Sequence, residues 1–472
     1  MNDVAAHDLE AFRGRLRGLG FFRPGVPITL ARAPGRLDVM GGIADYSGSL
    51  VLELPIREAT CAAVQSGERD EGLEVISLSE EERRFAIDRP GFARLLNGDE
   101  AAARRTFEDD HESAWAAYVA GVAIVLHRHL GASFDHGLRI VIWSRVPEGK
   151  GVSSSAALEV AVMKALAAES GLSLTGPDLA HWCQFVENRV VGAPCGIMDQ
   201  MTSALGRERE LLALLCQPAI VRGFVPVPDA IGFWGVDSGL RHAVSGSDYT
   251  SVRTGAFMGL RILAELCGKR PERIDDRGVV HIDRPPWEGH LANIDPARFT
   301  AGLAEKLPEF LEGHEFLKRY GGTTDPVTRV VPDRVYAVRQ PTAHPIHEHA
   351  RVRRFAQLLE GPLDGAALHE MGALMKGSHA SYSACGLGSE ATDRLVALVE
   401  EAGPAAGLFG AKITGGGSGG TVAILGWADA EGAVRELASR YESETGRHAT
   451  VFSGSSPGAE HVGVRRVTIS KD

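Results

Sequence analysis

Residues 146–160 read VPEGKGVSSSAALEV and form a glycine- and serine-rich loop between two regular segments. Before the loop, residues 137–143 alternate and are rich in β-branched residues, which predicts a strand. After it, residues 156–170 are rich in Ala, Leu, Val and Glu without Gly or Pro, which predicts a helix that ends at Gly171. A strand, loop and helix in this order direct free backbone N–H groups and the positive end of a helix dipole at one point.

This loop suits an anionic group such as phosphate. Its three consecutive hydroxyls, Ser153, Ser154 and Ser155, can bond phosphate oxygens, ligate Mg²⁺ or cap the helix. From these residues alone, a phosphate site and an ordinary helix cap stay equally open. The loop is not a Walker A sequence, because no Lys-Ser/Thr pair follows Gly149 at the required distance.

A second glycine-rich stretch, residues 414–420, formally contains G-x-G-x-x-G. A predicted strand at 421–425 follows it instead of a helix, so it does not indicate a dinucleotide-binding fold. A flexible loop that closes against another loop fits this stretch better.

The composition limits the class of protein. A chain of 472 residues with 44% hydrophobic and 24% charged residues is typical of a globular protein with two domains. The net charge of −11, without a basic run, argues against nucleic-acid binding. No segment approaches the roughly 18 apolar residues of a membrane span, the acidic N-terminus does not resemble a signal peptide, and the cysteines lack CxxC spacing. We expect a cytoplasmic protein that binds neither nucleic acid nor membrane.

Predicted strands and helices are mixed along the chain, which indicates an α+β or α/β class. Residues 49–55 and 59–64 are predicted as two strands, and 231–236 as the strand that begins the second half. From residue 268 to about 350 the many Pro, Asp and Arg residues leave no clear pattern, and residues 351–359 are predicted as a helix.

Two further stretches hold candidate functional side chains. Within residues 33–46, Arg36 suits a transferring phosphate because its planar fork binds oxyanions at two points, and Asp45 can accept hydrogen bonds from sugar hydroxyls. A structural Arg–Asp pair across the turn is the alternative. Within residues 185–200, Glu187 falls at the edge of an apolar helical stripe and suits Mg²⁺, or else a salt bridge. Asp199 lies in an apolar run, which requires a partner or a role such as that of a catalytic base.

These motifs, in this order, resemble those of the GHMP-type small-molecule kinases, in their galactokinase branch. The resemblance rests on Pro34-Gly35-Arg36 with Asp45-Tyr46, on residues 149–160, on residues 195–200 and on residues 414–417, and extends from about residue 31 to about 425. It implies a two-domain α+β kinase, with an N-terminal half like ribosomal protein S5 domain 2, a ferredoxin-like C-terminal half and the site in the cleft between them. The implied divisions are residues 1–27 for an extension, 28–228 for the first domain and 229–472 for the second.

The resemblance also implies roles for single residues. The ATP phosphate loop would comprise Gly149, Lys150, Gly151, Val152, Ser153, Ser154 and Ser155. Ser155 and Glu187 match Mg²⁺ ligands, Asp199 matches the base for the anomeric hydroxyl of a sugar, and Arg36 matches the group that stabilises the transferring phosphoryl. The sugar contacts would be Asp45, Gly42, Ile43 and Tyr249. ATP, Mg²⁺ and a monosaccharide are therefore the expected ligands, while the oligomeric state is not predicted.

One departure from the family pattern bears on the sugar. Galactokinases have Gly-Glu-His-Thr-Asp-Tyr where this chain has Gly41-Gly42-Ile43-Ala44-Asp45-Tyr46, and the lost Glu and His contact the sugar around its C6 hydroxymethyl group. L-Arabinopyranose has the ring configuration of galactose without C6, so we expect L-arabinose to be phosphorylated at C1. An apolar wall also leaves a C6 hydroxyl unpaired. Changing Gly42 to Glu and Ile43 to His is expected to shift preference towards galactose.

Residues 37–52 and 381–389 also resemble the kinases of the family that act on L-arabinose. Three alternatives stay open: a galactokinase, a kinase of another sugar such as glucuronate, and a regulator that senses sugar without phosphorylating it. The complete serine loop and Asp199 speak against the regulator, because sensors of this type have a damaged loop.

Overall fold

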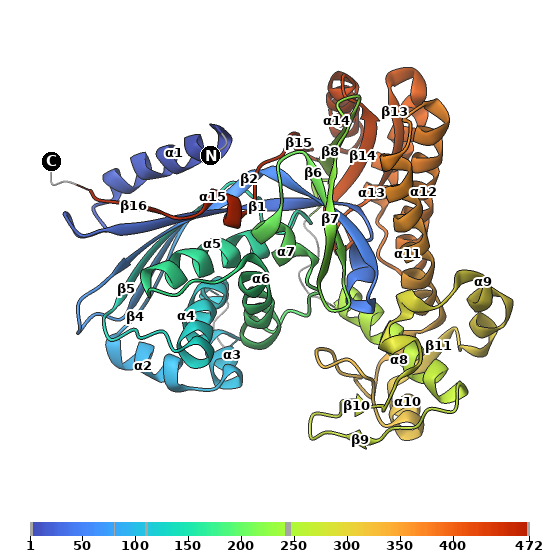
Figure 1. The fold of residues 1–472 in the computed structure, drawn as a ribbon, viewed down its shortest axis with the longest axis horizontal. Coiled ribbons are helices and arrows are strands. Elements are labelled where there is room, and N and C mark those ends of the chain that lie inside the picture. The colour runs from blue at the N-terminus through green and yellow to red at the C-terminus, as the bar shows by residue number, and fades with distance from the viewer. Residues whose placement is uncertain (1–2, 80, 109–111, 241–246, 470–472) are drawn as a thin grey trace.

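The computed structural model describes residues 3–79, 81–108, 112–240 and 247–469. Its N-terminal half is built on an eight-stranded sheet and its C-terminal half on a four-stranded sheet (Figure 1). Most strand pairs are antiparallel and the helices are grouped beside the sheets. The class is therefore α+β, as predicted.

The first sheet has the strand order β16-β1-β2-β5-β3-β4, and β6 pairs with β2 and with β7. Its strands are β1 (Ile28–Met40), β2 (Leu50–Ser66), β3 (Leu73–Leu78), β4 (Glu82–Ile87), β5 (Leu138–Ser144), β6 (Glu210–Leu215), β7 (Ile220–Pro226) and β16 (Arg465–Val467). The prediction of two strands at 49–55 and 59–64 was wrong, because both belong to β2. The first part of β2 pairs with β6 and the last part with β5. Pro55 lies between these two ladders, and on the other side of β2 it is opposite Arg36, beside a register shift in the pairing with β1.

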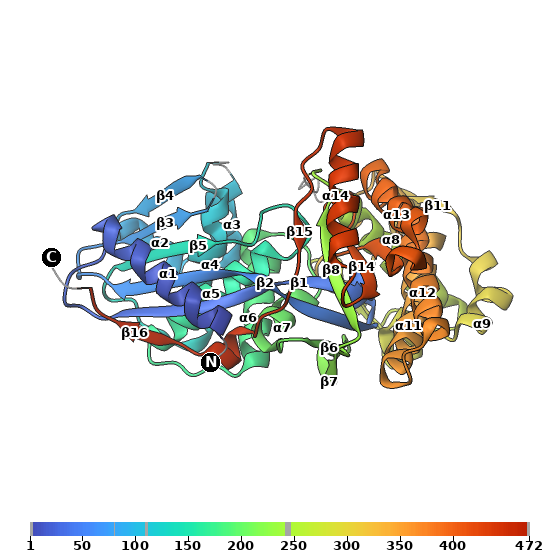
Figure 2. The ribbon, with the colours of Figure 1, turned by 90° about the horizontal axis from the view of Figure 1, so that it is seen from above.

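Helices cover both faces of the first sheet, with α1 on one side and the others opposite it (Figure 1 and Figure 2). Their bounds are α1 (Asp3–Leu19), α2 (Arg89–Asn97), α3 (Glu100–Glu108), α4 (Ala117–Leu130), α5 (Ser154–Glu169), α6 (Gly176–Phe185) and α7 (Met198–Leu205), and a π-helical turn (Val186–Val191) continues α6. The main core joins α4, α5, α6 and α7 to one face through residues such as Ala62 and Ile140. Leu9, Phe12 and Leu16 of α1 pack on the other face. The alternation of inward and outward residues along the strands supplies both apolar faces.

The second sheet has the order β13-β14-β8-β15. Its strands are β8 (Ile231–Asp237), β13 (Leu408–Ile413), β14 (Thr421–Trp427) and β15 (Val451–Phe452). The helices of this half are α8 (Ser247–Leu266), α11 (Arg339–Glu360), α12 (Gly365–Ala384), α13 (Glu390–Ala402) and α14 (Glu431–Thr445). The short helix α15 (Ala459–Val462) packs instead against α7 and β1 of the first half. One core lies between this sheet and α13 with α14. Another joins α11 and α12 to both β8 and β1, so the two halves share apolar packing.

The segment without a clear sequence pattern folds around α8 and the start of α11. It contains β9 (Arg273–Ile274), β10 (Val280–His281), α9 (Pro296–Arg298), β11 (Phe310–Glu312), α10 (Gly313–Tyr320) and β12 (Val335–Ala337). Their apolar side chains, with those of α8 and α11, form a separate cluster. Helix α11 begins well before the predicted residue 351 and contains Pro345, which concealed its first turns in the sequence.

The division between domains at residues 228 and 229 stays a prediction. The chain passes from the first sheet to the second between β7 and β8, but β16, near the end of the chain, pairs with β1. No helix within the described ranges is long and apolar enough to span a bilayer.

Candidate functional site

A cavity of about 280 Å³ lies between the glycine-serine loop, the start of α7 and the glycine loop after β13. Of the predicted residues, it is lined by Arg36, Ile43, Asp45, Gly149, Gly151, Ser153, Ser154, Ser155, Glu187, Asp199 and Tyr249. Among the described residues, three predicted ones, Gly42, Lys150 and Val152, do not line it. Tyr118 and Thr250 line the cavity without having been predicted, since neither belongs to a recognisable motif. Segments far apart in the sequence thus meet at one site.

The glycine-serine loop does not end in an ordinary helix cap. Gly149 and Gly151 adopt positive φ angles of 71° and 72°, and Ser153, the residue before α5, is left-handed with φ 61°. The Ser153 side chain makes no capping hydrogen bond, and its buried hydroxyl has no partner. A buried hydroxyl without a hydrogen-bond partner lowers the stability of the folded protein, unless a bound ligand supplies that partner. The cap alternative is therefore wrong for Ser153, and the loop presents an open hydroxyl and the N-terminus of a 16-residue helix to the cavity.

Lys150 and Val152, the two loop residues that do not line the cavity, attach the loop to the rest of the protein. Lys150 pairs with Asp237 of β8 at 2.8 Å, and the Lys150 carbonyl accepts a hydrogen bond of 2.7 Å from the Thr421 hydroxyl. The Val152 carbonyl accepts a hydrogen bond of 3.1 Å from the Arg36 N–H. These contacts fix the loop to both halves of the molecule and turn Lys150 away from the cavity.

Arg36 is the cationic centre of the site and is almost wholly buried. Its guanidinium lies 2.7 Å from Asp199 and 3.2 Å from Glu53, and it donates to the Gly151 carbonyl at 2.8 Å. Burial opposes its charge, but Asp199, Glu53 and Asp38 together raise the pKa of Arg36 above its usual value. Arg36 therefore stays protonated and connects the candidate base with the phosphate-type loop.

Glu187 and Ser155 offer oxygen ligands to a cation. Both residues line the cavity, and the Glu187 carboxylate accepts a hydrogen bond of 2.7 Å from the Gln200 amide. Burial and the nearby charge of Asp199 raise the pKa of Glu187 to about 7. The ionised form of Glu187 is therefore unfavourable, because it is buried and is repelled by Asp199. A hard divalent cation, bound by this carboxylate and the Ser155 hydroxyl, would reduce that repulsion.

At the other end of the cavity, Asp45 is buried against backbone. Its Oδ1 accepts a hydrogen bond of 2.6 Å from the Tyr46 N–H. A Cβ atom at Gly196 would overlap the Asp45 carboxylate, so the glycine there makes room for it. The rings of Tyr46 and Tyr249 meet edge to face at 5.8 Å and close the wall beside it.

Sequence reasoning missed the ion pair that supports this end. Arg253 forms two hydrogen bonds of 2.8 Å to Asp325 and a third of 3.0 Å to the Cys195 carbonyl, next to Gly196. Asp325 lies in the segment without a pattern, and no spacing links it to Arg253. The pair fixes the loop that carries Gly196 and thereby the position of Asp45.

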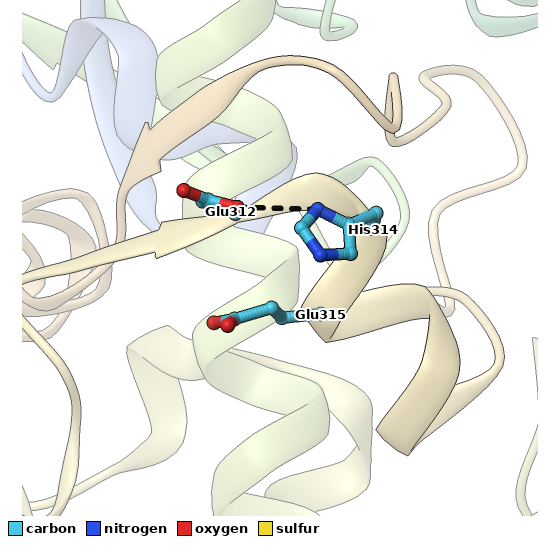
Figure 3. Close-up of side chains that lie close together, drawn as sticks. All are labelled: Glu312, His314 and Glu315. Carbon is cyan, nitrogen blue, oxygen red and sulfur yellow. Dashed lines mark ion pairs between the residues drawn. The ribbon is translucent and has the colours of Figure 1, made fainter.

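A separate group of possible metal ligands lies outside this cavity. Glu312, His314 and Glu315 come together at the start of α10 (Figure 3), and all three side chains are exposed. Glu312 and His314 form an ion pair of 3.2 Å. None of the three lines the cavity described above, and an exposed acidic group of this kind is common without a metal.

Comparison with known proteins places this arrangement in a family. Residues 117–207 match the GHMP kinases N terminal domain, and residues 365–443 match the GHMP kinases C terminal domain. The galactokinase of Chloroflexus aurantiacus is 30% identical over 427 residues, which are 89% of this chain and 90% of that protein. The chain belongs to the GHMP kinase family. Membership of this family implies the use of ATP.

Other relatives of this GHMP kinase agree with the assignment. The L-arabinokinase of Arabidopsis thaliana is 43% identical over 520 residues, which are 98% of this chain and 50% of that protein. This chain thus spans about half the length of that relative. The structure of the Lactococcus lactis galactokinase complexed with galactose superposes with a TM-score of 0.71, at 20% identity, and covers 97% of this chain and all of that one. The fold is that of the GHMP kinases, as predicted.

The Asp45 carboxyl gives a pH-dependent prediction for this GHMP kinase without ligands. Burial, and secondly the charge of Asp199, raise the pKa of Asp45 from 3.8 to about 7, against the opposing effect of Arg253. The folded protein therefore holds this proton more tightly than the unfolded chain, so this stabilisation is complete below about pH 4 and lost as the pH rises through about 7. Between pH 5.5 and 7.5, Asp45 should lower the free energy of unfolding by about 2 kcal/mol.

Urea unfolding of the wild type and of Asp45→Asn, each at pH 5.5, 6.5 and 7.5, measures this effect. Burial lowers the pKa of His344 to about 3 and that of His349 to about 4, so these groups act in the opposite direction, but equally in both proteins. The difference in unfolding free energy between the two proteins should therefore change with pH by the stated amount. A difference that does not vary with pH would contradict the raised pKa of Asp45.

Proposed function

We propose that this protein transfers the γ-phosphoryl group of ATP to the anomeric hydroxyl of L-arabinose. The oxygen on C1 forms a new bond to the γ-phosphorus, and the bond from that phosphorus to the β,γ-bridging oxygen breaks. The products are L-arabinose 1-phosphate, ADP and the proton that leaves O1. The observation that carries the proposal is that Asp199, Arg36 and the serine loop line one cavity with Asp45 and Ile43 at its other end.

In this proposal the residues divide the work of phosphoryl transfer. Asp199 accepts or orients the proton of O1, and its contact with Arg36 fixes the carboxylate. Arg36 stabilises the charge on the transferring phosphoryl group. The Gly149–Ser155 loop and the N-terminus of α5 bind the phosphate oxygens of ATP. Positioning and charge stabilisation thus supply most of the catalysis.

We also propose that Ser155 and Glu187 hold a Mg²⁺ ion in this site. The ion, when bound, would neutralise phosphate charge during the transfer. The raised pKa of Glu187 supports this role, because the carboxylate lies near Asp199 without a cationic partner of its own. Gln200 donates to Glu187 and keeps it oriented whether or not a cation is bound.

Ile43 supports the choice of a pentose. Its side chain lines the cavity near Asp45, where galactokinases carry a histidine. An isoleucine offers no hydrogen bond to a C6 hydroxyl, and L-arabinopyranose has no C6 group to be left unpaired. The similarity to the L-arabinokinase extends over 98% of this chain, although the activity of that longer protein comes to this chain only as part of the proposal.

Two kinds of alternative remain. Galactose is the first alternative substrate, because the Chloroflexus aurantiacus galactokinase is 30% identical to this chain. Glucuronate is the second. The carboxylate of glucuronate would face the same Ile43 without a cation beside it. A sugar-sensing regulator is a different class, but the open Ser153 hydroxyl and the Asp199–Arg36 pair favour chemistry.

Steady-state release of ADP with L-arabinose, D-galactose and D-glucuronate, side by side, tests the proposal. We expect kcat/KM for L-arabinose to exceed that for galactose by about 10- to 100-fold, as an unpaired hydroxyl in an apolar pocket suggests. A preference for galactose would overturn the choice of sugar. Binding of sugar and ATP by calorimetry without any ADP release would favour the regulator.

A further inference from the structure

Tyr382 lies behind the sugar end of the cavity and does not line it. It belongs to the last turn of α12 and is fully buried with Ile43, Val252, Leu387 and other apolar side chains. Its hydroxyl accepts a hydrogen bond of 2.9 Å from the Ile43 N–H and donates one of 3.0 Å to the Gly415 carbonyl. One side chain thus connects the backbone of two residues that line the cavity, one at the sugar end and one in the glycine loop.

Gly42 is packed directly against this tyrosine. Its φ is +46°, and a Cβ atom at this position would overlap the Tyr382 hydroxyl and lie 2.7 Å from Asp38 Oδ2. Asp38 cannot give way easily, because its carboxylate accepts the Gly42 N–H at 3.0 Å and pairs with the buried Lys412 at 2.6 Å. Position 42 therefore has no room for any side chain while Tyr382 and Asp38 keep their places.

The expectation that Glu at position 42 and His at position 43 shift preference towards galactose stays a prediction, and this packing indicates that the shift is limited while Tyr382 is present. The glutamate side chain would have to pass through the space that the Tyr382 hydroxyl occupies. The identity of residue 42 is therefore coupled to that of a residue on a different helix.

We propose that Tyr382 and Gly42 form a matched pair that determines sugar specificity. Tyr382 excludes a side chain at position 42 and holds the Ile43 backbone so that the isoleucine side chain forms the apolar wall. Tyr382 is thus a positioning residue, which acts through Ile43 without touching the sugar. This inference rests on the proposed function, since it explains how a pentose is preferred at the same site.

A double-mutant cycle tests the steric part of the proposal. Gly42→Ala alone should lower kcat/KM for L-arabinose at least about tenfold, mainly through KM, because the methyl group displaces the Ile43 turn. In a Tyr382→Leu background the same change should cost at least about threefold less than in the wild type, because the overlap with the hydroxyl is gone while the contact with Asp38 remains in both backgrounds. The strain of an alanine at positive φ is present in both backgrounds and cancels. If Gly42→Ala lowers kcat/KM by the same factor in both backgrounds, the proposal that Gly42 and Tyr382 form a matched pair is wrong.

Two further variants keep this test interpretable. Tyr382→Phe removes the hydroxyl and leaves the ring carbon that carried it 2.9 Å from the added Cβ atom, so it should show a smaller coupling of the same sign if Tyr382→Leu does not fold. Tyr441→Phe is the matched control, because Tyr441 is also fully buried and donates one hydrogen bond of 2.7 Å, to the Ser238 carbonyl in another core cluster. The changes in kcat/KM caused by Tyr441→Phe and by Gly42→Ala should be additive. If Gly42→Ala is coupled to Tyr441→Phe as strongly as to the Tyr382 variant, the proposal is overturned.

The specificity part is tested with galactose. The triple variant Gly42→Glu, Ile43→His, Tyr382→Leu should raise the galactose to L-arabinose ratio of kcat/KM at least about tenfold above that of Gly42→Glu, Ile43→His. If the two-residue change shifts the ratio as far as the three-residue change, Tyr382 does not determine specificity. A wild type that prefers galactose would overturn the proposed function, whereas the coupling between residues 42 and 382 would still be measured, with galactose as the substrate.

Discussion

Replacing Asp199 by asparagine should lower kcat by about 10²- to 10⁴-fold and leave the Kd of ATP within about threefold of the wild type. Asparagine has the same shape, and its carbonyl oxygen can still accept the hydrogen bond that Arg36 Nε donates to Asp199 at 2.8 Å. The substitution removes the negative charge that would accept the proton of O1. The geometry of the site should therefore persist while the proton transfer fails.

Single-turnover kinetics and calorimetric ATP binding separate these effects. Asp229→Asn is a matched control, because Asp229 is an exposed carboxylate that pairs with Arg209 at 2.6 Å, and neither residue lines the cavity. It should leave both kcat and ATP binding unchanged. If Asp199→Asn also abolishes ATP binding or cooperative unfolding, then Asp199 has a structural role and the base is another group.

The second large effect is expected for Arg36→Met, which should reduce both activity and stability. Removal of the guanidinium eliminates the charge that stabilises the transferring phosphoryl group, and losses of about 10³- to 10⁵-fold in kcat are typical for such an arginine. It also leaves Glu53 fully buried without the cation that lies 3.2 Å away. Burial and the charge of Asp38 already raise the pKa of Glu53, so without Arg36 this carboxyl either takes up a proton or stays charged. An uncompensated buried charge costs up to about 3–5 kcal/mol of unfolding free energy, and protonation reduces that loss.

The double variant Arg36→Met, Glu53→Gln distinguishes the two roles of Arg36. Glutamine at position 53 cannot carry the buried charge, so the unfolding free energy measured with urea should recover most of what Arg36→Met loses. Phosphoryl transfer should not recover, because no cation replaces the guanidinium beside Asp199. Recovery of turnover together with stability would mean that Arg36 acts only by holding the fold.

The local motifs of the site could be predicted from the sequence, because each is a short run with its own backbone geometry. The strand, loop and helix around residues 146–160 appear as β5, a loop with left-handed residues and α5. Glu187 and Asp199 were identified as charged groups in apolar surroundings, and both line the cavity. Such signals depend on residues close together in the chain.

Interactions between distant segments left no such signal. The Arg253–Asp325 pair, the Arg36–Glu53 pair and the Gly42–Tyr382 contact each join parts of the chain that no spacing connects. The segment from residue 268 to about 350 was also unpredictable, because its strands of two or three residues are too short to show a period and prolines interrupt the first turns of α11. These elements are held by the apolar cluster of α8 and α11 instead of by local propensity.

The central claim is that this cavity phosphorylates the anomeric hydroxyl of L-arabinose. Incubation of the protein with L-arabinose, ATP and Mg²⁺, followed by ¹H–³¹P correlation NMR of the product, tests it most directly. We predict a sugar phosphate whose phosphorus couples to the anomeric proton, formed in equal amount with ADP and about 10²- to 10⁴-fold more slowly with Asp199→Asn. A phosphate on another carbon, or galactose 1-phosphate from a parallel galactose reaction with no product from L-arabinose, would contradict the account.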